Sequence, residues 1–549
     1  MSADVRIDRR ALLAVTAAMG VAVGTGVVIR DAAGQEVNSE GATPVPAGSP
    51  VPPELASSDT DWAVEGGNLS QTREAMGSTI SSSNVSTLGV AWTTEIAASS
   101  GYGSMSANPI IVGDLVYQQD MQSNVWALNK DTGEVVWKNE YNEGSTGPNG
   151  VAVGYGYAVF ALGNSGNVVA VKADTGEEVW RHSIKGPLGE VIDMAPLIYG
   201  STVIISTIPG NTDNFYRGGQ RGVVHAIDVT NGNVLWYVDT TTDNLWNNPR
   251  VNSGGGLWHP PSVDKDGNFY LGIANAAPYP GLPGHPSGTS RMGNNDYADS
   301  LVKLNGQTAV IEWFLNIKPH DIFDLDNHLS PILATISRNG VDTDVVYSSG
   351  KHGLVVCADA ASGVEIWRTP VGKHSNDNLQ ELPDDEYVEV FPGTLGGVET
   401  PFAYAQGVVL VPVYNMASYY NSTGISAEGI DITKTTGNLV ALDAGTGSTL
   451  WDAELPAGLL AGATVVNDLV FTGSLDGVVR GFTIADGKQV FSWQAPAGLN
   501  APFAISGDTL FVPAGGPLVP SKDTVAPDQP KMQLVALKLG ASGDATPAS

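Results

Sequence analysis

The segments Ala127-Leu-Asn-Lys-Asp-Thr-Gly-Glu-Val-Val-Trp137 and Ala170-Val-Lys-Ala-Asp-Thr-Gly-Glu-Glu-Val-Trp180 share one pattern. An apolar run with alanine is followed by Thr-Gly, and a tryptophan comes four residues after the glycine. The run predicts a strand, and Asp or Asn with Thr-Gly predicts a tight turn, because glycine accepts positive φ. The pattern recurs, twice in degenerate form, at Ala226–Trp236, Ala358–Trp367, Ala441–Trp451, Lys303–Trp313 and Phe482–Phe491.

The spacing of the repeats predicts a β-propeller. Gly133 and Gly176 are 43 residues apart, and Gly447 and Gly487 are 40 apart, which leaves room for about four short strands per unit. The apolar runs Leu88–Trp92 and Gln533–Lys538 each form half a unit. We therefore expect an all-β fold, an eight-bladed propeller of four-stranded antiparallel blades, in which the N- and C-terminal strands share the closing blade.

Composition excludes several classes of ligand. The 549 residues include 27 basic and 57 acidic side chains, for a formal net charge of −30. Nucleic-acid binding depends on clustered Lys and Arg, so we expect no nucleic-acid partner. The same charge disfavours an anionic membrane surface.

Cys357 is the only cysteine. An intrachain disulfide, a multi-thiolate zinc site and an iron–sulfur cluster are therefore excluded. An attached c-type haem needs two cysteines followed by histidine and is excluded as well. If the protein transfers electrons, a separate protein must accept them.

The N-terminus resembles an export signal. Arg9-Arg10 precedes an apolar run of small residues that ends at Ile29, as in twin-arginine signals. An uncleaved membrane anchor is the alternative. We predict an export signal at 1–33, a disordered linker rich in Pro, Ala and Gly at 34–58, one propeller domain at 59–540 and a disordered tail at 541–549. We expect no membrane span in the mature chain and a periplasmic, extracellular or cell-surface location.

The repeat Ala-x-Asp-x-x-Thr-Gly-x-x-x-Trp resembles the blade repeat of quinoprotein alcohol dehydrogenases, which bind pyrroloquinoline quinone. The resemblance extends from Asp61 to Ala536. Gly255-Gly-Leu-Trp-His259 is similar to the family segment whose tryptophan lies under the quinone, which implies that role for Trp258. Leu271-Gly-Ile-Ala-Asn-Ala-Ala-Pro278 is similar to the segment whose asparagine ligates the metal, which implies Asn275.

The most specific match is Lys318-Pro-His-Asp-Ile-Phe-Asp-Leu-Asp326. Its resemblance to Thr-Pro-His-Asp-x-Trp-Asp implies that Asp324 is the catalytic base and a metal ligand. Asp326 matches an additional acidic ligand of the lanthanide-using branch, and Lys351 matches a basic residue that contacts the quinone oxygens. A carboxylate can accept the hydroxyl proton of an alcohol, and oxygen ligands suit hard cations.

The sequence departs from the family at other positions. The family's adjacent cysteine pair is absent, and Asn149 stands where an arginine grips a quinone carboxylate. Alignment places Arg217 at the family's metal-binding glutamate, although an insertion would let Asp213 serve. The family's Asn-Trp pair is replaced by Gly396-Gly-Val-Glu-Thr-Pro401, which brings Glu399 into the cofactor-binding set.

The resemblance implies an exported dehydrogenase that oxidises a small alcohol with pyrroloquinoline quinone and a calcium or lanthanide ion. Its electrons would pass to a separate acceptor such as a cytochrome. Two alternatives stay open. One is a non-catalytic propeller acting as a scaffold or binding module, and the other is a solute-binding or hydrolytic propeller with Asp324 and Asp326 around a different metal.

Overall fold

The computed structural model describes residues 50–56, 60–210, 218–338, 340–426, 431–521 and 529–543, together with the backbone of residues 29–30 and 36–38. The fold is all-β, as predicted. The described helices are short: α2 (Pro53–Ala56), η1 (Val85–Thr87), η2 (Thr289–Arg291) and η4 (Ile432–Lys434). None of the described helices is long and apolar enough to cross a bilayer.

Antiparallel four-stranded units make up most of the described chain. The first four units contain β5 (Ile110–Val112), β6 (Leu115–Gln119), β7 (Val125–Asn129) and β8 (Val135–Asn139); β9 (Val151–Gly154), β10 (Tyr157–Leu162), β11 (Asn167–Lys172) and β12 (Glu178–Ser183); β13 (Leu197–Tyr199), β14 (Thr202–Ser206), β15 (Val223–Asp228) and β16 (Val234–Asp239); and β18 (Ser262–Val263), β19 (Phe269–Ile273), β21 (Ser300–Leu304) and β22 (Ile311–Asn316).

The remaining units contain β23 (Ile332–Arg338), β24 (Val341–Ser348), β25 (Leu354–Asp359) and β26 (Glu365–Pro370); β28 (Ala403–Ala405), β29 (Val408–Asn415), β32 (Thr436–Asp443) and β33 (Thr449–Leu455); β34 (Thr464–Val466), β35 (Leu469–Gly473), β36 (Val478–Thr483) and β37 (Gln489–Gln494); and β39 (Ala504–Ser506), β40 (Thr509–Gly516), β41 (Gln533–Leu539) and β4 (Leu88–Glu95). In the last unit β4 pairs antiparallel with β41, so strands from the two ends of the chain lie in one sheet, as predicted.

Shorter strands extend or cover these units. β1 (Ile29–Arg30) and β2 (Glu36–Asn38) continue the β13–β16 sheet, β3 (Glu74–Ala75) runs parallel to β34, and β38 (Gly498–Leu499) pairs with β40. Two small sheets lie outside the repeat. They are formed by β17 (Ser253–Gly254) with β20 (Ala276–Ala277), and by β27 (Val388–Val390), β30 (Ser418–Asn421) and β31 (Gly424–Ile425).

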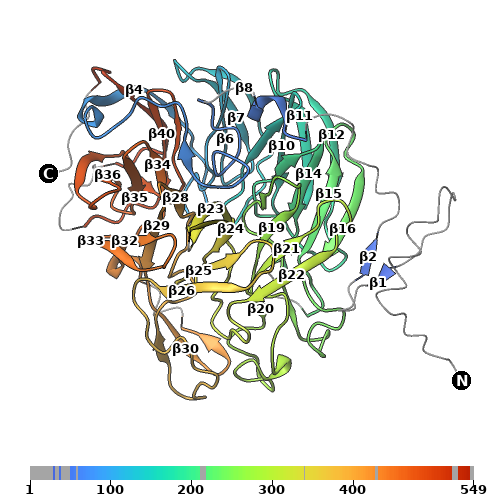
Figure 1. Cartoon of the computed structure of the whole chain (residues 1–549). Coiled ribbons are helices and arrows are strands. Elements are labelled where there is room, and N and C mark those ends of the chain that lie inside the picture. The colour runs from blue at the N-terminus through green and yellow to red at the C-terminus, as the bar shows by residue number, and fades with distance from the viewer. Residues whose placement is uncertain are drawn as a thin grey trace, which may run out of the picture.

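The units follow one another around a common centre (Figure 1). The colour passes from blue β6 through green β14 and yellow β24 to red β40, which lies beside blue β4. The first strands of successive units contact one another, as in β5 with β9, β9 with β13, β23 with β28, β28 with β34 and β39 with β5. This arrangement gathers the loops that precede these strands near the centre.

Most tryptophans of the repeat pack against the turn of the next unit. The indole Nε1 of Trp137 donates to the carbonyl of Ala173, and a β-carbon built on Gly176 would lie only 2.7 Å from that ring. The same contact joins Trp92 to Gly133, Trp180 to Gly232, Trp367 to Gly447 and Trp451 to Gly487. The Thr-Gly turn and the tryptophan therefore stabilise the boundary between units, which accounts for their joint recurrence.

Gly176→Ala tests this contact. Gly176 has φ +72° and no room for a β-carbon, so we expect the free energy of unfolding to fall by about 2 kcal/mol or more. Gly156→Ala is the matched control, because Gly156 has φ +80° but no heavy atom within 4 Å of the point that a β-carbon would occupy. Urea unfolding of both variants should show the larger loss for Gly176→Ala. Equal losses would contradict a role for the ring contact.

Residues 61–75 run across several units. Their backbone bonds to Ile111, Val263, Leu333, Tyr404 and Val465, which belong to five different units. The guanidinium of Arg73 is almost fully buried, with an exposed fraction of 1%, and it donates to five acceptors. They are the carbonyls of Ala463, Glu65 and Phe503 and the side chains of Asn108 and Thr464. This segment therefore links distant units through one buried cation.

Parts of the predicted linker and of the predicted tail contact the predicted propeller domain. Within the predicted linker, α2 places the Glu54 carboxylate where it accepts hydrogen bonds from the amides of Tyr155 and Gly156. Within the predicted tail, Gly543 pairs with Val90. The predicted export signal lies outside the described residues except for 29–30. The predicted linker is described only at 36–38 and 50–56, and the predicted tail only at 541–543.

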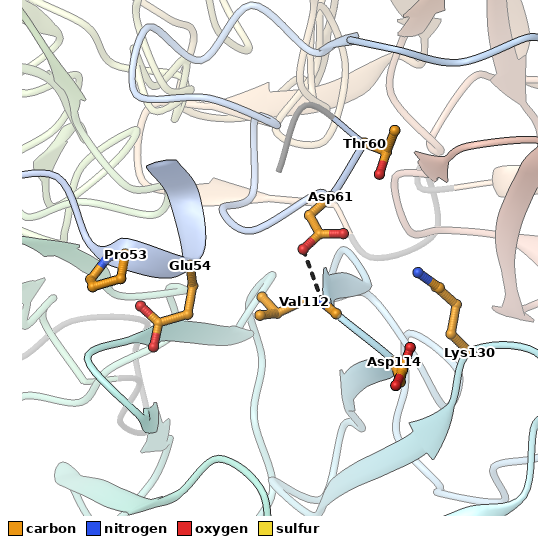
Figure 2. A pocket seen from close by; sticks show the side chains of 8 residues that line it. Pro53, Glu54, Thr60, Asp61, Val112, Asp114 and Lys130 are labelled. Carbon is orange, nitrogen blue, oxygen red and sulfur yellow. Dashed lines mark hydrogen bonds between the residues drawn. The ribbon is translucent and has the colours of Figure 1, made fainter. Parts of the chain in front are cut away.

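A hollow of about 510 Å³ lies between α2 and the turn after β5. Figure 2 shows Glu54, Asp61, Asp114 and Lys130 around it, with the Asp61 carboxylate accepting from the amide of Gly113. None of the predicted site residues lines this hollow.

Candidate functional site

Loops at the ends of strands carry the predicted site residues. Asn149 precedes β9, Trp258 lies between β17 and β18, and Asn275 lies between β19 and β20. Asp324 and Asp326 lie between β22 and β23, Lys351 lies in the turn from β24 to β25, and Glu399 precedes β28. Asp213 lies outside the described residues.

Asp324, Asp326 and Lys351 are in direct contact. The ammonium Nζ of Lys351 is 3.1 Å from Oδ2 of Asp324 and 2.5 Å from Oδ2 of Asp326. All three side chains are buried. Burial lowers the pKa of Lys351, but attraction to Asp324, Asp326 and Glu399 raises it well above its usual range. The Lys351 ammonium therefore lies between two acidic side chains.

Asn275 joins the group through its backbone. Its amide N donates to Oδ1 of Asp326 at 2.6 Å, and its side chain is buried. Two carboxylates and one amide oxygen are ligands that hard cations prefer. Among the described residues, no three carboxylate, imidazole or thiolate groups converge as a metal site. An ion at this site would therefore need the side-chain oxygen of Asn275 as its third ligand. Its other two ligands would be the carboxylates of Asp324 and Asp326, which contact Lys351.

Glu399 adds a third carboxylate to this electrostatic group. Burial raises the pKa of Glu399 to about 8, and Asp326 and Asp324 add to this shift while Lys351 opposes it. Its Oε2 is buried and has no hydrogen-bond partner among the described residues. Burial likewise raises the pKa of Asp324 to about 7, although Lys351 and a hydrogen bond from Thr394 favour its charged form.

A second group surrounds Trp258. A β-carbon built on Gly147 would lie 2.8 Å from the Trp258 ring and 2.4 Å from Cβ of Asp193, so the glycine allows this loop to approach the indole closely. The backbone of Asn149 forms an isolated parallel β-bridge with Met194, which is the residue after Asp193. Its Nδ2 donates to the carbonyl of Asp120, while its Oδ1 is buried and has no hydrogen-bond partner among the described residues.

Tyr102 relates the two groups. The residue is 43% exposed, and the partial burial of its phenol raises the pKa; Lys351 lowers this pKa, and Glu399, Asp324 and Asp193 each raise it. Charges in both groups therefore shift the pKa of this phenol. Of the predicted residues, the structure brings Asp324, Asp326, Lys351 and Asn275 into contact, with Glu399 coupled to them through its charge. Trp258 and Asn149 belong to the neighbouring group around Asp193.

Sequence reasoning missed several polar residues of this region. Asp193 is buried and accepts hydrogen bonds from the hydroxyls of Ser145 and Thr146, and burial raises its pKa. His328 lies between the carbonyls of Asp326 and Glu399, and burial lowers its pKa to about 3. Its ring is 5.8 Å from that of His259, which contacts Glu65 at 2.6 Å. The sequence has no local motif for such contacts between units.

The residues of the candidate site fit the implied metal ion and the implied quinone to different extents. Asp324, Asp326 and Asn275 supply oxygen atoms for a hard cation, and the partly exposed indole of Trp258 offers a flat surface for a planar ring. The unpartnered polar atoms of Glu399 and Asn149 are buried acceptors that an additional group could satisfy. Asp193, which lies with Trp258 against Gly147, is acidic and therefore supplies no cation for a quinone carboxylate.

Comparisons with known proteins identify the family. The profile of the glucose/ethanol/alcohol dehydrogenase β-propeller domain matches residues 185–378. The profile of the outer membrane protein assembly factor BamB matches residues 24–260 and 421–543, together more than half of the chain. The chain belongs to the family of pyrroloquinoline-quinone-type β-propellers that includes the quinoprotein alcohol dehydrogenases.

Individual relatives agree with this assignment. Dehydrogenase XoxF of Paracoccus denitrificans is 24% identical over 80% of this chain and 83% of its own length. Quinoprotein ethanol dehydrogenase of Pseudomonas putida is 25% identical over 71% of this chain and 67% of its own length. The structure of quinohemoprotein alcohol dehydrogenase from Comamonas testosteroni superposes with a TM-score of 0.75 at 20% identity, covering 89% of this chain and 82% of that one.

Proposed function

We propose that this protein is an exported dehydrogenase that oxidises a small alcohol with pyrroloquinoline quinone and a calcium or lanthanide ion. The observation that carries the proposal is the contact of Asp324 and Asp326 with Lys351, beside Asn275. Acidic side chains, an amide and an amine thus meet at one point, and this supports the proposal.

The residues have distinct proposed roles. A bound quinone would supply the two-electron oxidant for the alcohol, and a bound ion would supply a Lewis acid beside it. Asp324 accepts the hydroxyl proton of the alcohol. Asp324, Asp326 and Asn275 hold the ion, and Asp213 is a further candidate ligand.

The other residues bind and orient the cofactor. Trp258 supports its flat face, and Lys351 stabilises the negative charge that develops on its oxygens. Glu399 and Asn149 are the further residues that would hold it.

We further propose that the four-stranded units are the eight blades of one closed ring. The pairing of β4 with β41 and the contact of β39 with β5 support this. The twin-arginine-like N-terminus supports export. Because the sequence has one cysteine and no c-type haem motif, the electrons go to a separate carrier such as a cytochrome.

Reconstitution tests the function. The purified chain is incubated with the quinone and with calcium or lanthanum, and dye-linked oxidation of methanol and ethanol is measured beside the quinone absorbance of the washed protein. We expect ion-dependent turnover and retained absorbance. Absence of both with either ion would refute the proposal.

A scaffold or binding module is the second candidate. The long match to the BamB profile and Asn149 in place of the family's arginine favour it. A scaffold would retain no quinone under the same conditions, so the reconstitution experiment separates the two functions.

A further inference from the structure

The β27–β30–β31 sheet packs directly on the segment that carries Asp324. Ile322, Phe323 and Leu325 form one buried apolar cluster with Leu382, Val390 and Tyr420. The rings of Phe323 and Tyr420 meet edge to face, with centroids 5.1 Å apart. This sheet is an insertion in two parts, because β27 lies between β26 and β28 while β30 and β31 lie between β29 and β32, and it belongs to none of the repeated units.

The insertion also fixes the backbone before Asp324. The hydroxyl of Tyr420 donates to the carbonyl of Phe323 at 2.7 Å. From the other side, the Asp321 carboxylate accepts from the amides of Phe323 and Leu325. Asp324 itself has φ +67°, a conformation that non-glycine residues adopt only when their surroundings impose it. These contacts supply that constraint.

Thr394 extends the constraint to the side chain. Its hydroxyl donates to Oδ2 of Asp324, the same oxygen that Lys351 contacts. Thr394 is in turn fixed by the insertion, because its amide donates to the hydroxyl of Ser418 and the amide of Gly393 donates to the carbonyl of Met416. Ser418 pairs with Val390, so Thr394 is attached to the sheet itself.

We propose that Thr394 is a positioning residue for Asp324, held in place by the β27–β30–β31 sheet. The Thr394 hydroxyl on Oδ2 fixes the rotation of the carboxylate and leaves Oδ1 to accept the substrate proton. This inference rests on the proposed function, in which Asp324 is the base. It assigns the insertion a role in orienting that base.

Substitution of Thr394 provides the kinetic test. Thr394→Val keeps the shape but removes the donor, and we expect kcat to fall about tenfold, the scale of one hydrogen bond to a charged group, with little change in KM. Thr394→Ser keeps the hydroxyl and should restore kcat to within about twofold of the unmodified protein. Thr335→Val is the matched control, because the Thr335 hydroxyl bonds to the carboxylate of Asp344 on an exposed strand.

Tyr420→Phe tests the backbone contact independently. It removes the hydroxyl bound to Phe323, and we expect a fall in kcat in the same direction. Tyr419→Phe is its control, because the neighbouring Tyr419 hydroxyl contacts Glu389 at the exposed surface. Neither control variant should change kcat.

Crystal structures of the apoprotein variants provide a readout without turnover. We expect Asp324 in one orientation in the unmodified protein and in Thr394→Ser, and in a different or a second orientation in Thr394→Val. The inference is overturned if Thr394→Val retains full kcat and the same Asp324 orientation, or if Thr394→Ser is impaired as severely as Thr394→Val. If the unmodified protein does not oxidise alcohols after reconstitution, the proposed function fails, and this role for Thr394 fails with it.

Discussion

Asp324→Asn is expected to lower kcat of the reconstituted protein by about 10²- to 10⁴-fold, the usual contribution of a general base. The amide has nearly the same shape but cannot accept the alcohol proton. It also leaves Lys351 with a single carboxylate partner in place of two. Steady-state kinetics with ethanol and thermal unfolding of the same preparation measure the two effects separately.

The control for this substitution is Asp342→Asn, which removes a carboxylate from an exposed position on β24. It should leave kcat unchanged. If Asp324→Asn retained kcat within about threefold of the unmodified protein, far less than the expected loss, Asp324 would not be the base.

Arg73→Met is expected to cause the largest loss of stability. Five acceptors bind the buried guanidinium, and carbonyls left without a donor cost about 1 to 3 kcal/mol each. We therefore expect the free energy of unfolding to fall by at least about 3 kcal/mol. The acceptors lie in segments distant in sequence, so urea unfolding should show a lower midpoint for the whole domain.

Arg250→Met is the control, because Arg250 is exposed. It should change the free energy of unfolding by less than about 0.5 kcal/mol. Similar stability of the two variants would show that the buried cation does not connect the units.

The repeat was predictable because its signal is local. Asn129 or Asp228, the turn glycine and the tryptophan of each copy lie within about ten residues, so one stretch contains both the turn and the ring that packs on the next unit. Even the degenerate copy at Lys303–Trp313 forms paired strands, because Ala309 adopts φ +55° in place of the missing glycine.

The order of Asp324, Asp326 and Lys351 along the chain predicted a shared site, and these three side chains do meet. The residues that position these side chains were not predictable, because they come from distant segments of the chain. Thr394 is 70 residues from Asp324, and its hydroxyl belongs to an insertion without a recognisable motif. Asp193 and Trp258 are also distant in sequence, and both lie against Gly147.

The contact between the predicted linker and the turn from β9 to β10 also joins distant segments. The Pro-rich composition before residue 59 predicts an extended linker. It does not reveal that Glu54 accepts hydrogen bonds from the turn between β9 and β10. Composition describes local preference, and a contact across 100 residues can override it.

The central claim is that Asp324, Asp326 and Asn275 hold an ion beside a planar quinone above Trp258. Anomalous diffraction from crystals grown with the quinone and europium tests it most directly. We predict a europium peak within coordination distance of the oxygens of these three side chains, with the quinone lying on the indole and Lys351 directed to the quinone oxygens. A europium peak elsewhere, or Lys351 still bridging the two carboxylates with no quinone on Trp258, would contradict the account.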